Sequence, residues 1–345
     1  MKLLLLPSFV RRFIIIILLG PSLVFSFLFV ALSILFYPLV FIRGKISLSK
    51  NSSTRYIRFS LMIVWYLLME CLGTIIAFIL WVGTTGGYFM LSRPSQRIHA
   101  LVQYRWACSL LLGVRLFFNT RIIFPDCTVF NSGPMLIAAQ HSSFFDALIP
   151  TVLLGKGGGS IVPRHVLKSG LLLSPSLDFY GNRLPNKFVT RSSTTRSLDI
   201  SGVYSIGEEL HKDACVIFPE GTFYSPKRFT KVIEKLQLSD PERVGEVSQL
   251  NHLLPVKPGG ILALVSSAPN ADLVMVGHYG LSSFSSFKEI INNIPFQNPI
   301  EIYVKRIPSA CLPSDTSACL KFIDNEWLNI DNWLQSKIRN YECSY

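Results

Sequence analysis

The chain has 345 residues, of which half are hydrophobic and only 16% are charged, against about a quarter in ordinary soluble domains. Its formal net charge of +12 leaves two classes of anionic partner, nucleic acid and an anionic membrane surface. The signature motifs of RNA-recognition domains, zinc fingers and basic zippers are absent from the sequence, so we expect no nucleic-acid partner. The length gives room for one large domain or two ordinary ones.

Two long apolar runs dominate the first quarter of the chain. Residues 13–42 carry no charge, and residues 59–91 carry only Glu70. Each run exceeds the roughly 20 residues that a helix needs to cross a bilayer. The first is too long for the apolar region of a signal peptide, which has about 7 to 15 residues. We therefore predict N-terminal hydrophobic membrane helices within residues 1–91, followed by a water-facing domain over residues 92–345.

The basic residues beside these runs bear on topology. They form three clusters, within residues 2–12, 43–58 and 93–105. Because Lys and Arg next to membrane segments favour the cytoplasmic face, we expect a protein of the inner (cytoplasmic) membrane whose domain faces the cytoplasm. Two simple spans would put the middle cluster on the opposite face, whereas re-entrant or interfacial helices would keep all three together. Gly20-Pro21 could break the first run, and Glu70 would be costly at mid-bilayer, so both topologies stay open.

Beyond the membrane region, helix-like spacing over residues 95–118 is followed by short apolar runs that alternate with helix-like stretches. The expected strands are residues 121–124, 135–139, 214–218, 273–277 and 300–305, and the expected later helices are residues 143–154, 197–212, 259–267 and 318–340. Alternation of this kind predicts an α/β fold with a mixed sheet that is flanked by helices on both faces.

The stretch "IAAQHSSFFDAL", residues 137–148, places His141 five residues before Asp146, where an expected strand gives way to an expected helix. With Ser142 or Ser143 as the N-cap, Asp146 falls in the first helical turn. A carboxylate there can hold an imidazole in one tautomer, so that the other ring nitrogen accepts a proton. The same letters also fit a capping box from Ser143 to Asp146, so the pair has a structural interpretation as well.

A second motif, "CVIFPEGTF" at residues 215–223, is a strand that runs into Pro219-Glu220-Gly221-Thr222. Such a turn offers backbone N–H groups and a hydroxyl to an anion. The pentapeptide F-P-E-G-T, downstream of His-x4-Asp in an anchored α/β chain, resembles the glycerolipid acyltransferase superfamily. The resemblance covers about residues 100–310.

The resemblance implies roles for particular residues. His141 would be the general base and Asp146 its orienting partner, while Glu220, Gly221 and Thr222 would bind the acceptor together with Arg191. Arg191 comes from "GNRLPNKFVTRS", residues 181–192, which resembles the family's second block, although Arg183 could take that place instead. "HLLPVKPGG", residues 252–260, resembles the fourth block, where Lys257 and a helix start could lie near a phosphate or form a plain loop.

The resemblance also implies an activity. The family member it points to transfers a fatty acyl chain to the sn-2 hydroxyl of 1-acylglycerol 3-phosphate (lysophosphatidic acid), which gives phosphatidic acid in phospholipid biosynthesis. The donor would be acyl-CoA or acyl-carrier protein, the other partners membrane phospholipids, and neither a bound cofactor nor a metal is expected. Two alternatives remain, namely another acceptor (glycerol 3-phosphate or another lysophospholipid) and an inactive membrane scaffold. The five other histidines, among them His278, are expected to be structural or at the surface.

Overall fold

The structure is a computed structural model that describes residues 4, 6–38, 54–158, 161–189 and 196–342. Its contacts divide the chain into two compact units of three segments each. Unit 1 comprises Met1–Ile122, Lys168–Pro185 and Ser286–Pro299, and unit 2 comprises Ile123–Leu167, Asn186–Ser285 and Ile300–Tyr345. The division differs from the expected boundary between residues 91 and 92, because later segments of the chain pack with the apolar N-terminal helices.

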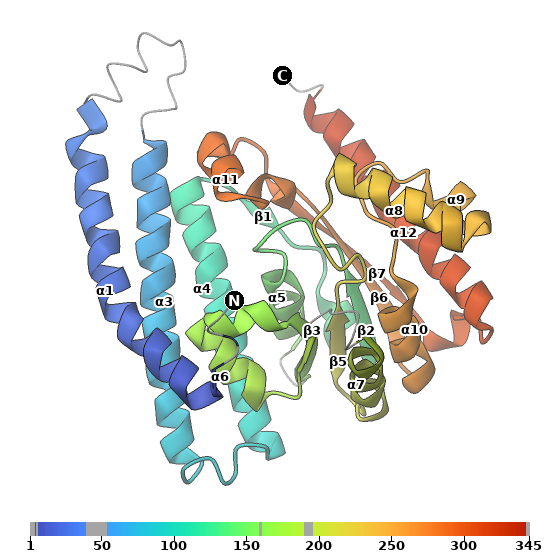
Figure 1. The fold of residues 1–345 in the computed structure, drawn as a ribbon, viewed down its shortest axis with the longest axis horizontal. Coiled ribbons are helices and arrows are strands. Elements are labelled where there is room, and N and C mark those ends of the chain that lie inside the picture. The colour runs from blue at the N-terminus through green and yellow to red at the C-terminus, as the bar shows by residue number, and fades with distance from the viewer. Residues whose placement is uncertain (1–3, 5, 39–53, 159–160, 190–195, 343–345) are drawn as a thin grey trace. The chain divides into compact units, whose positions relative to one another are not determined.

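Unit 1 is built of helices (Figure 1). They are α1 (Ser8–Leu35), α3 (Arg55–Gly83), α4 (Arg93–Phe118), η3 (Ser169–Leu173), α6 (Pro175–Arg183) and α11 (Phe287–Asn293). The first two run antiparallel, since the hydroxyl oxygen of Ser33 near the end of α1 lies 3.4 Å from that of Ser60 near the start of α3. Residues 55 and 58, from the middle basic cluster, therefore lie at the other end of this pair from Arg11 and Arg12 of the first cluster.

By length and composition, α1 and α3 could each cross a membrane. Their most apolar windows of 18 residues have mean hydropathies of 2.7 and 2.2, and only 17% and 22% of these windows are buried. At about 1.5 Å per residue each helix is roughly 42 Å long, against about 30 Å for the hydrocarbon core of a bilayer. The expectation that Gly20-Pro21 breaks the first run is wrong, because α1 continues through Pro21. A proline removes one backbone hydrogen bond of a helix. The apolar turns before and after Pro21 remain helical, so α1 is not interrupted.

Glu70, in the second half of α3, is fully buried and has partners from a distant part of the chain. Its carboxylate accepts hydrogen bonds from the Ser174 hydroxyl at 3.0 Å and from the Ser176 backbone N–H at 2.9 Å, at the start of α6. The Tyr180 hydroxyl of α6 donates to the carbonyl oxygen of Gly73 at 2.9 Å. The polar group that the sequence marks as costly in a membrane is thus hydrogen-bonded within the protein.

Another charged contact of α6 reaches α1. Asp178 is buried, and its carboxylate accepts hydrogen bonds from the guanidinium groups of Arg11 and Arg12 at 3.1 to 3.2 Å. Removing one partner of such a buried pair leaves an uncompensated charge, so this cluster fixes where α6 lies against α1.

The seven strands form one mixed sheet, as expected. They are β1 (Ile122–Ile123), β2 (Met135–Ala139), β3 (Pro163–Lys168), β4 (Lys187–Val189), β5 (Ala214–Ile217), β6 (Asp272–Tyr279) and β7 (Ile300–Ile307), in the spatial order β1-β7-β6-β2-β5-β3-β4. β2 is parallel to both β5 and β6, β3 is parallel to β5, and β7 is antiparallel to β6. Strands β3 and β4 are absent from the sequence-based prediction.

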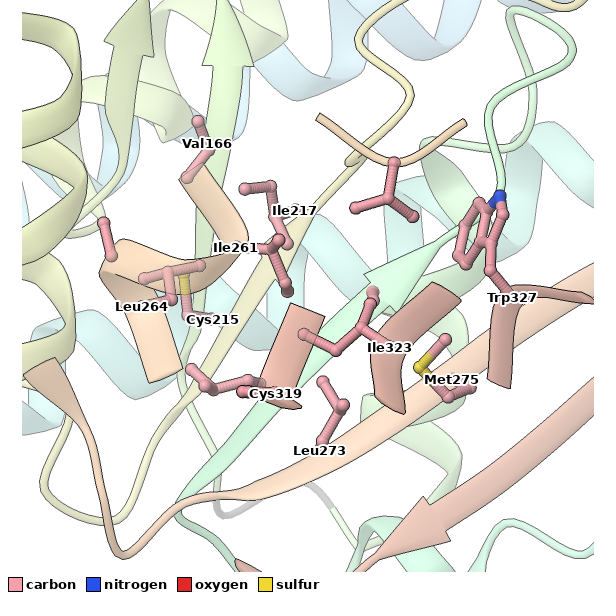
Figure 2. Packing of buried hydrophobic residues seen from close by; sticks show 14 of the residues in the cluster. Val166, Cys215, Ile217, Ile261, Leu264, Leu273, Met275, Cys319, Ile323 and Trp327 are labelled. Atoms are coloured by element: carbon pink, nitrogen blue, oxygen red, sulfur yellow. The ribbon is translucent and has the colours of Figure 1, made fainter. Parts of the chain in front are cut away.

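Helices of unit 2 cover both faces of the sheet. They are α5 (Leu148–Lys156), α7 (Arg196–Glu208), α8 (Pro226–Ser239), α9 (Pro241–Val247), α10 (Pro258–Ser267) and α12 (Thr316–Glu342). Figure 2 shows one face, where Val166, Ile217 and Met275 of the strands pack against α10 and α12. Trp327 of α12 is fully buried there. On the opposite face, Thr151 of α5 lies 3.2 Å from the ring of His165, the residue before Val166 in β3.

Asp331 of α12 supports a prediction about stability. Its buried carboxylate accepts hydrogen bonds from three consecutive backbone N–H groups, those of Asn251, His252 and Leu253, at 2.7 to 3.0 Å. We expect Asp331→Ala to lower the free energy of unfolding by about 3 kcal/mol or more, because buried donors are left unsatisfied. Thermal unfolding of the purified protein measures this, with the exposed Asn332→Ala on the same helix as the control. Equal melting temperatures for the two variants would contradict the prediction.

Candidate active site

The candidate site lies at one edge of the sheet, where three neighbouring parallel strands end. β2 stands between β6 and β5, and all three run in the same direction (Figure 1). The carboxyl ends of parallel strands meet at the same edge of a sheet. His141 comes just after β2 and Glu220 just after β5, and His278 is the penultimate residue of β6. The topology therefore brings together two motifs that are 79 residues apart and a histidine that belongs to neither motif.

His141 and Asp146 are adjacent in the structure. Nδ1 of His141 lies 3.4 Å from Oδ2 of Asp146, and the histidine side chain is 22% exposed while the aspartate is fully buried. The same Oδ2 accepts the backbone N–H groups of Ser142 at 2.5 Å and Ser143 at 2.8 Å. In return, the Ser143 hydroxyl accepts the N–H of Asp146 at 3.3 Å. The capping-box contacts and the His–Asp pair thus coexist, and one carboxylate serves both.

The start of the following helix differs from the sequence-based prediction. Residues 142–147 form bends and turns, and α5 begins only at Leu148, after Ala147 as the N-cap residue. The physical reason is the double hydrogen bond from Ser142 and Ser143 to Asp146, which closes a turn before the helix. This turn holds the aspartate beneath His141.

Asp146 also faces a second imidazole. Nε2 of His278 lies 3.6 Å from Oδ2 of Asp146, and His278 is 2% exposed. Burial acts to raise the pKa of Asp146, but the contacts with His141 and His278 outweigh it and lower this pKa to about 2. Asp146 is therefore an ionised carboxylate at neutral pH.

The pKa of Glu220 is shifted in the opposite direction from that of Asp146. Its side chain is 1% exposed, and neither carboxyl oxygen has a hydrogen-bond partner among the described residues. Burial, followed by the negative charge of Asp146, raises the pKa of Glu220 well above its ordinary value. The site thus holds two carboxyl groups whose surroundings move their pKa values apart, a pattern typical of acid–base sites.

The turn that carries Glu220 is closed by its own backbone. The N–H of Gly221 donates to the carbonyl oxygen of Phe218 at 3.1 Å, so this amide is used inside the turn and is not presented to an anion as expected. Gly221 has φ of +72°, a conformation that favours glycine. Thr222 follows the turn and is half-buried.

Aromatic rings surround the imidazole of His141. The ring centroids of Phe218 and Phe223 lie 4.8 Å and 4.5 Å from that of His141. Phe144, which is 55% exposed, packs edge-on against Phe223. These rings limit the access of water to the imidazole, which strengthens its electrostatic interaction with Asp146.

A cavity of about 880 Å³ opens beside the turn. Phe218, Pro219 and Gly221 form part of its wall. The aliphatic residues of the remaining wall are Val166, Val189, Ile200, Val203, Ile217, Val232, Leu236 and Val256, and its charged residues are Lys231, Lys235, Asp240, Arg243 and Lys257. A cavity of this size and composition fits an apolar chain with an anionic group.

Three basic residues were considered as ligands of a phosphate, and they lie in different parts of the chain. Arg191 lies outside the described residues, so its role stays a prediction. Arg183 belongs to α6 in unit 1, where its buried guanidinium donates to the carbonyl oxygen of Ala77 at 2.7 Å. Lys257 precedes α10, its backbone N–H donates to the carbonyl oxygen of Pro219 at 2.9 Å, and it lines the cavity. Of Arg183 and Lys257, only Lys257 lies where the cavity is.

His278 is the site residue that the sequence analysis missed. It sits near the end of the apolar run "DLVMVGHYG", and a histidine at the carboxyl end of a central parallel strand is a usable signal. A structural or surface position was expected from the sequence; in the structure His278 is buried and its ring faces Asp146. Within the described residues, no three His, Cys, Asp or Glu side chains are grouped so that they could hold a metal ion.

No protein-family model and no curated protein matches this sequence. Among solved structures, the fold is similar to that of the 1-acyl-sn-glycerophosphate (LPA) acyltransferase PlsC from Thermotoga maritima. The two sequences are 11% identical, the TM-score is 0.45, and the match covers 79% of this chain and 96% of that chain. A likeness of this degree concerns the course of the chain alone, so function has to be argued from the residues of this chain.

Proposed function

We propose that this chain is a glycerolipid acyltransferase. It moves a fatty acyl chain from acyl-CoA or acyl-carrier protein to the sn-2 hydroxyl of 1-acylglycerol 3-phosphate, and the product is phosphatidic acid. The observation that carries the proposal is the partly exposed imidazole of His141, 3.4 Å from the buried and ionised Asp146, beside the F-P-E-G-T turn and its apolar cavity. The resemblance of these two motifs to the acyltransferase superfamily supports the same activity.

We infer that His141 carries out the proton transfer. Because Nδ1 faces Asp146, Nε2 is the ring nitrogen that takes the proton of the acceptor hydroxyl. The hydroxyl oxygen forms a bond to the thioester carbonyl carbon, and the resulting tetrahedral intermediate breaks its C–S bond. The leaving thiolate receives the proton from the His141 imidazolium, which the Asp146 carboxylate stabilises in the interval. The histidine thus ends the cycle neutral.

The residues that line the cavity are an argument for a lipid substrate. Its aliphatic wall suits a fatty chain, and its three lysines, Lys231, Lys235 and Lys257, suit a phosphate. The raised pKa of Glu220 favours its protonated form, which can donate a hydrogen bond, whereas a carboxylate at this position would repel a phosphate. These features favour an acceptor that carries both an acyl chain and a phosphate over glycerol 3-phosphate.

The first prediction concerns catalysis, measured as thiol release from acyl-CoA with and without lysophosphatidate. We expect wild-type release to depend on the lysophosphatidate. His141→Ala should lower kcat by about 10² to 10⁴, because the hydroxyl loses its base. Asp146→Asn should be severely impaired as well, since an amide favours the wrong tautomer of His141. Activity of His141→Ala within tenfold of wild type would contradict the assignment.

Ser143→Ala is the matched control for Asp146→Asn. It removes the hydroxyl that accepts the N–H groups of Phe145 and Asp146, and leaves the contact between His141 and Asp146 in place. We expect it to lower the melting temperature and to keep kcat near that of wild type. If Asp146→Asn behaves in the same way, the aspartate only caps the turn.

The same assay distinguishes the two alternative functions. Thiol release that depends on glycerol 3-phosphate instead of lysophosphatidate would identify a different acceptor. A wild-type protein that releases no thiol would favour the scaffold alternative.

The second prediction concerns pH and Glu220. Because the folded state raises the pKa of Glu220, it holds this proton more tightly than the unfolded chain does. The stability that this contributes is complete below the ordinary pKa of about 4.3 and falls as pH rises from there through the folded pKa. Glu220→Gln replaces the group with a neutral one, so its melting temperature should exceed that of wild type by a margin that grows from pH 5 to pH 8. A constant margin would contradict a raised pKa of Glu220.

The third prediction concerns the membrane. We propose that the three basic clusters and the catalytic residues share the cytoplasmic face, which follows the orientation rule for Lys and Arg. Since Arg55 and Arg58 lie at the opposite end of the α1–α3 pair from Arg11 and Arg12, this requires the pair to lie along the membrane surface.

Single cysteines at residues 47, 52 and 266, in a cysteine-free background, would be treated with an impermeant thiol reagent on intact cells. Ser47 and Ser52 lie outside the described residues, and Ser266 is exposed on α10. Ser266 is preferred to Ser95 of the third basic cluster, because Ser95 is buried. We expect all three positions to be protected until the cells are permeabilised. Labelling of 47 and 52 with protection of 266 would establish two ordinary membrane crossings.

A further inference from the structure

His278 is a buried histidine to which the proposed reaction gives no role. Its Nε2 lies 3.6 Å from Oδ2 of Asp146, the same oxygen that lies 3.4 Å from Nδ1 of His141. His278 has no other ion-pair contact among the described residues, and neither of its ring nitrogens has a hydrogen-bond partner there. A buried polar group without a partner is costly, so the contact with the Asp146 carboxylate accounts for its orientation.

The backbone holds His278 in register with His141. The N–H of His278 donates to Oε1 of Gln140 at 2.8 Å, and the N–H of Gln140 donates to the carbonyl oxygen of Val276 at 2.9 Å. Gln140 is the residue immediately before His141. The end of β6 and the end of β2 are therefore joined by two hydrogen bonds, and the two imidazoles are fixed on either side of one carboxylate.

The other histidine buried within unit 2 provides a contrast. His165 of β3 is also close to fully buried, but its ring lies 3.2 Å from the Thr151 hydroxyl and has no carboxylate beside it. Burial lowers the pKa of His165 to about 4, so it is a neutral core residue. A histidine that only fills the core thus has a neutral hydroxyl partner in this protein, whereas His278 faces the orienting carboxylate of the site.

We propose that His278 is a positioning residue for the acyl transfer, with its Nε2–H directed at Asp146 so that Oδ2 stays aligned with Nδ1 of His141. The inference rests on the proposed function. A carboxylate held only by the turn at residues 142–146 could rotate away from the imidazole, since its Oδ1 has no hydrogen-bond partner in the described part of the chain. His278 opposes that rotation from the side of β6, and it neither touches the substrate nor carries a proton to it.

Three substitutions at position 278 test this. The amide nitrogen of His278→Gln reaches about as far as Nε2, that of His278→Asn reaches about as far as Nδ1, and His278→Leu has similar volume and no donor. We expect kcat to fall about 10- to 100-fold in the Leu and Asn variants, because Asp146 loses the contact that keeps it aligned with His141. The Gln variant should recover most of the loss. The KM values for donor and acceptor should stay within about twofold, because no substrate contact changes.

The melting temperature separates positioning from folding. His165→Leu is the matched control, since it removes a buried imidazole that has no contact with Asp146; it should lose stability and keep kcat. If His278→Leu does not fold, the comparison of His278→Gln with His278→Asn decides alone, because both retain a polar amide. Equal kcat for these two variants, or a kcat that follows the melting temperature across the whole set, would overturn the proposal.

The proposed function fails in a distinguishable way. If wild-type protein releases no thiol in the presence of lysophosphatidate or of the other acceptors, the acyltransferase assignment falls and the position-278 series has no activity to report on. If wild type is active, His141→Ala is inactive and His278→Leu matches wild type, then only the positioning role is wrong.

Discussion

A single buried carboxylate organises the candidate site. Asp146 is out of contact with solvent, yet its Oδ2 accepts two backbone N–H groups from residues 142 and 143 and faces imidazoles on two sides. The contacts with the two imidazoles outweigh the cost of burying the charge, which is why the pKa of Asp146 is low in spite of the burial. The irregular turn before α5 and the position of His141 both follow from this one group. Even the late start of α5 is a consequence of its hydrogen bonds.

Glu220 shows what happens to a carboxyl group in the same region without such contacts. Both its oxygens lack a partner among the described residues, and the neighbouring Asp146 adds a negative potential. Burial and this potential raise the pKa of Glu220 and so favour its protonated form. The pKa values of these two acidic residues, 74 positions apart in sequence, are therefore shifted in opposite directions, because two imidazoles face Asp146 whereas burial and the charge of Asp146 dominate at Glu220. In an acyltransferase that division gives one group for orienting a base and one for donating a hydrogen bond.

Much of this arrangement could be predicted from the sequence, and the exceptions have physical causes. The apolar runs of β2 and β5 predicted strands closely, because both are buried on both faces and contain no polar residue. β3 was missed because its letters, "PRHVLK", look polar, although Arg164 pairs with Asp213 and His165 with Thr151 inside the fold. The position of His278 depends on which strands become neighbours, and spacing along the chain does not contain that information. The two motifs at residues 141–146 and 219–222 were identified because each of them is local.

The contacts of Glu70 bear on how the chain is made. Its partners Ser174 and Ser176 follow it by 104 and 106 residues, so α3 has left the ribosome long before they exist. During that interval the carboxyl group has to be satisfied by water, lipid headgroups or a proton, and α1 and α3 wait for α6 before their packing is complete. The segment that completes them is an excursion between two strands of the sheet, β3 and β4. The helices that look like a detachable anchor therefore depend on a later part of the sequence. Exchanging them for another anchor at residue 91 would remove Glu70, Arg11 and Arg12, and would leave Ser174, Ser176 and Asp178 without these partners.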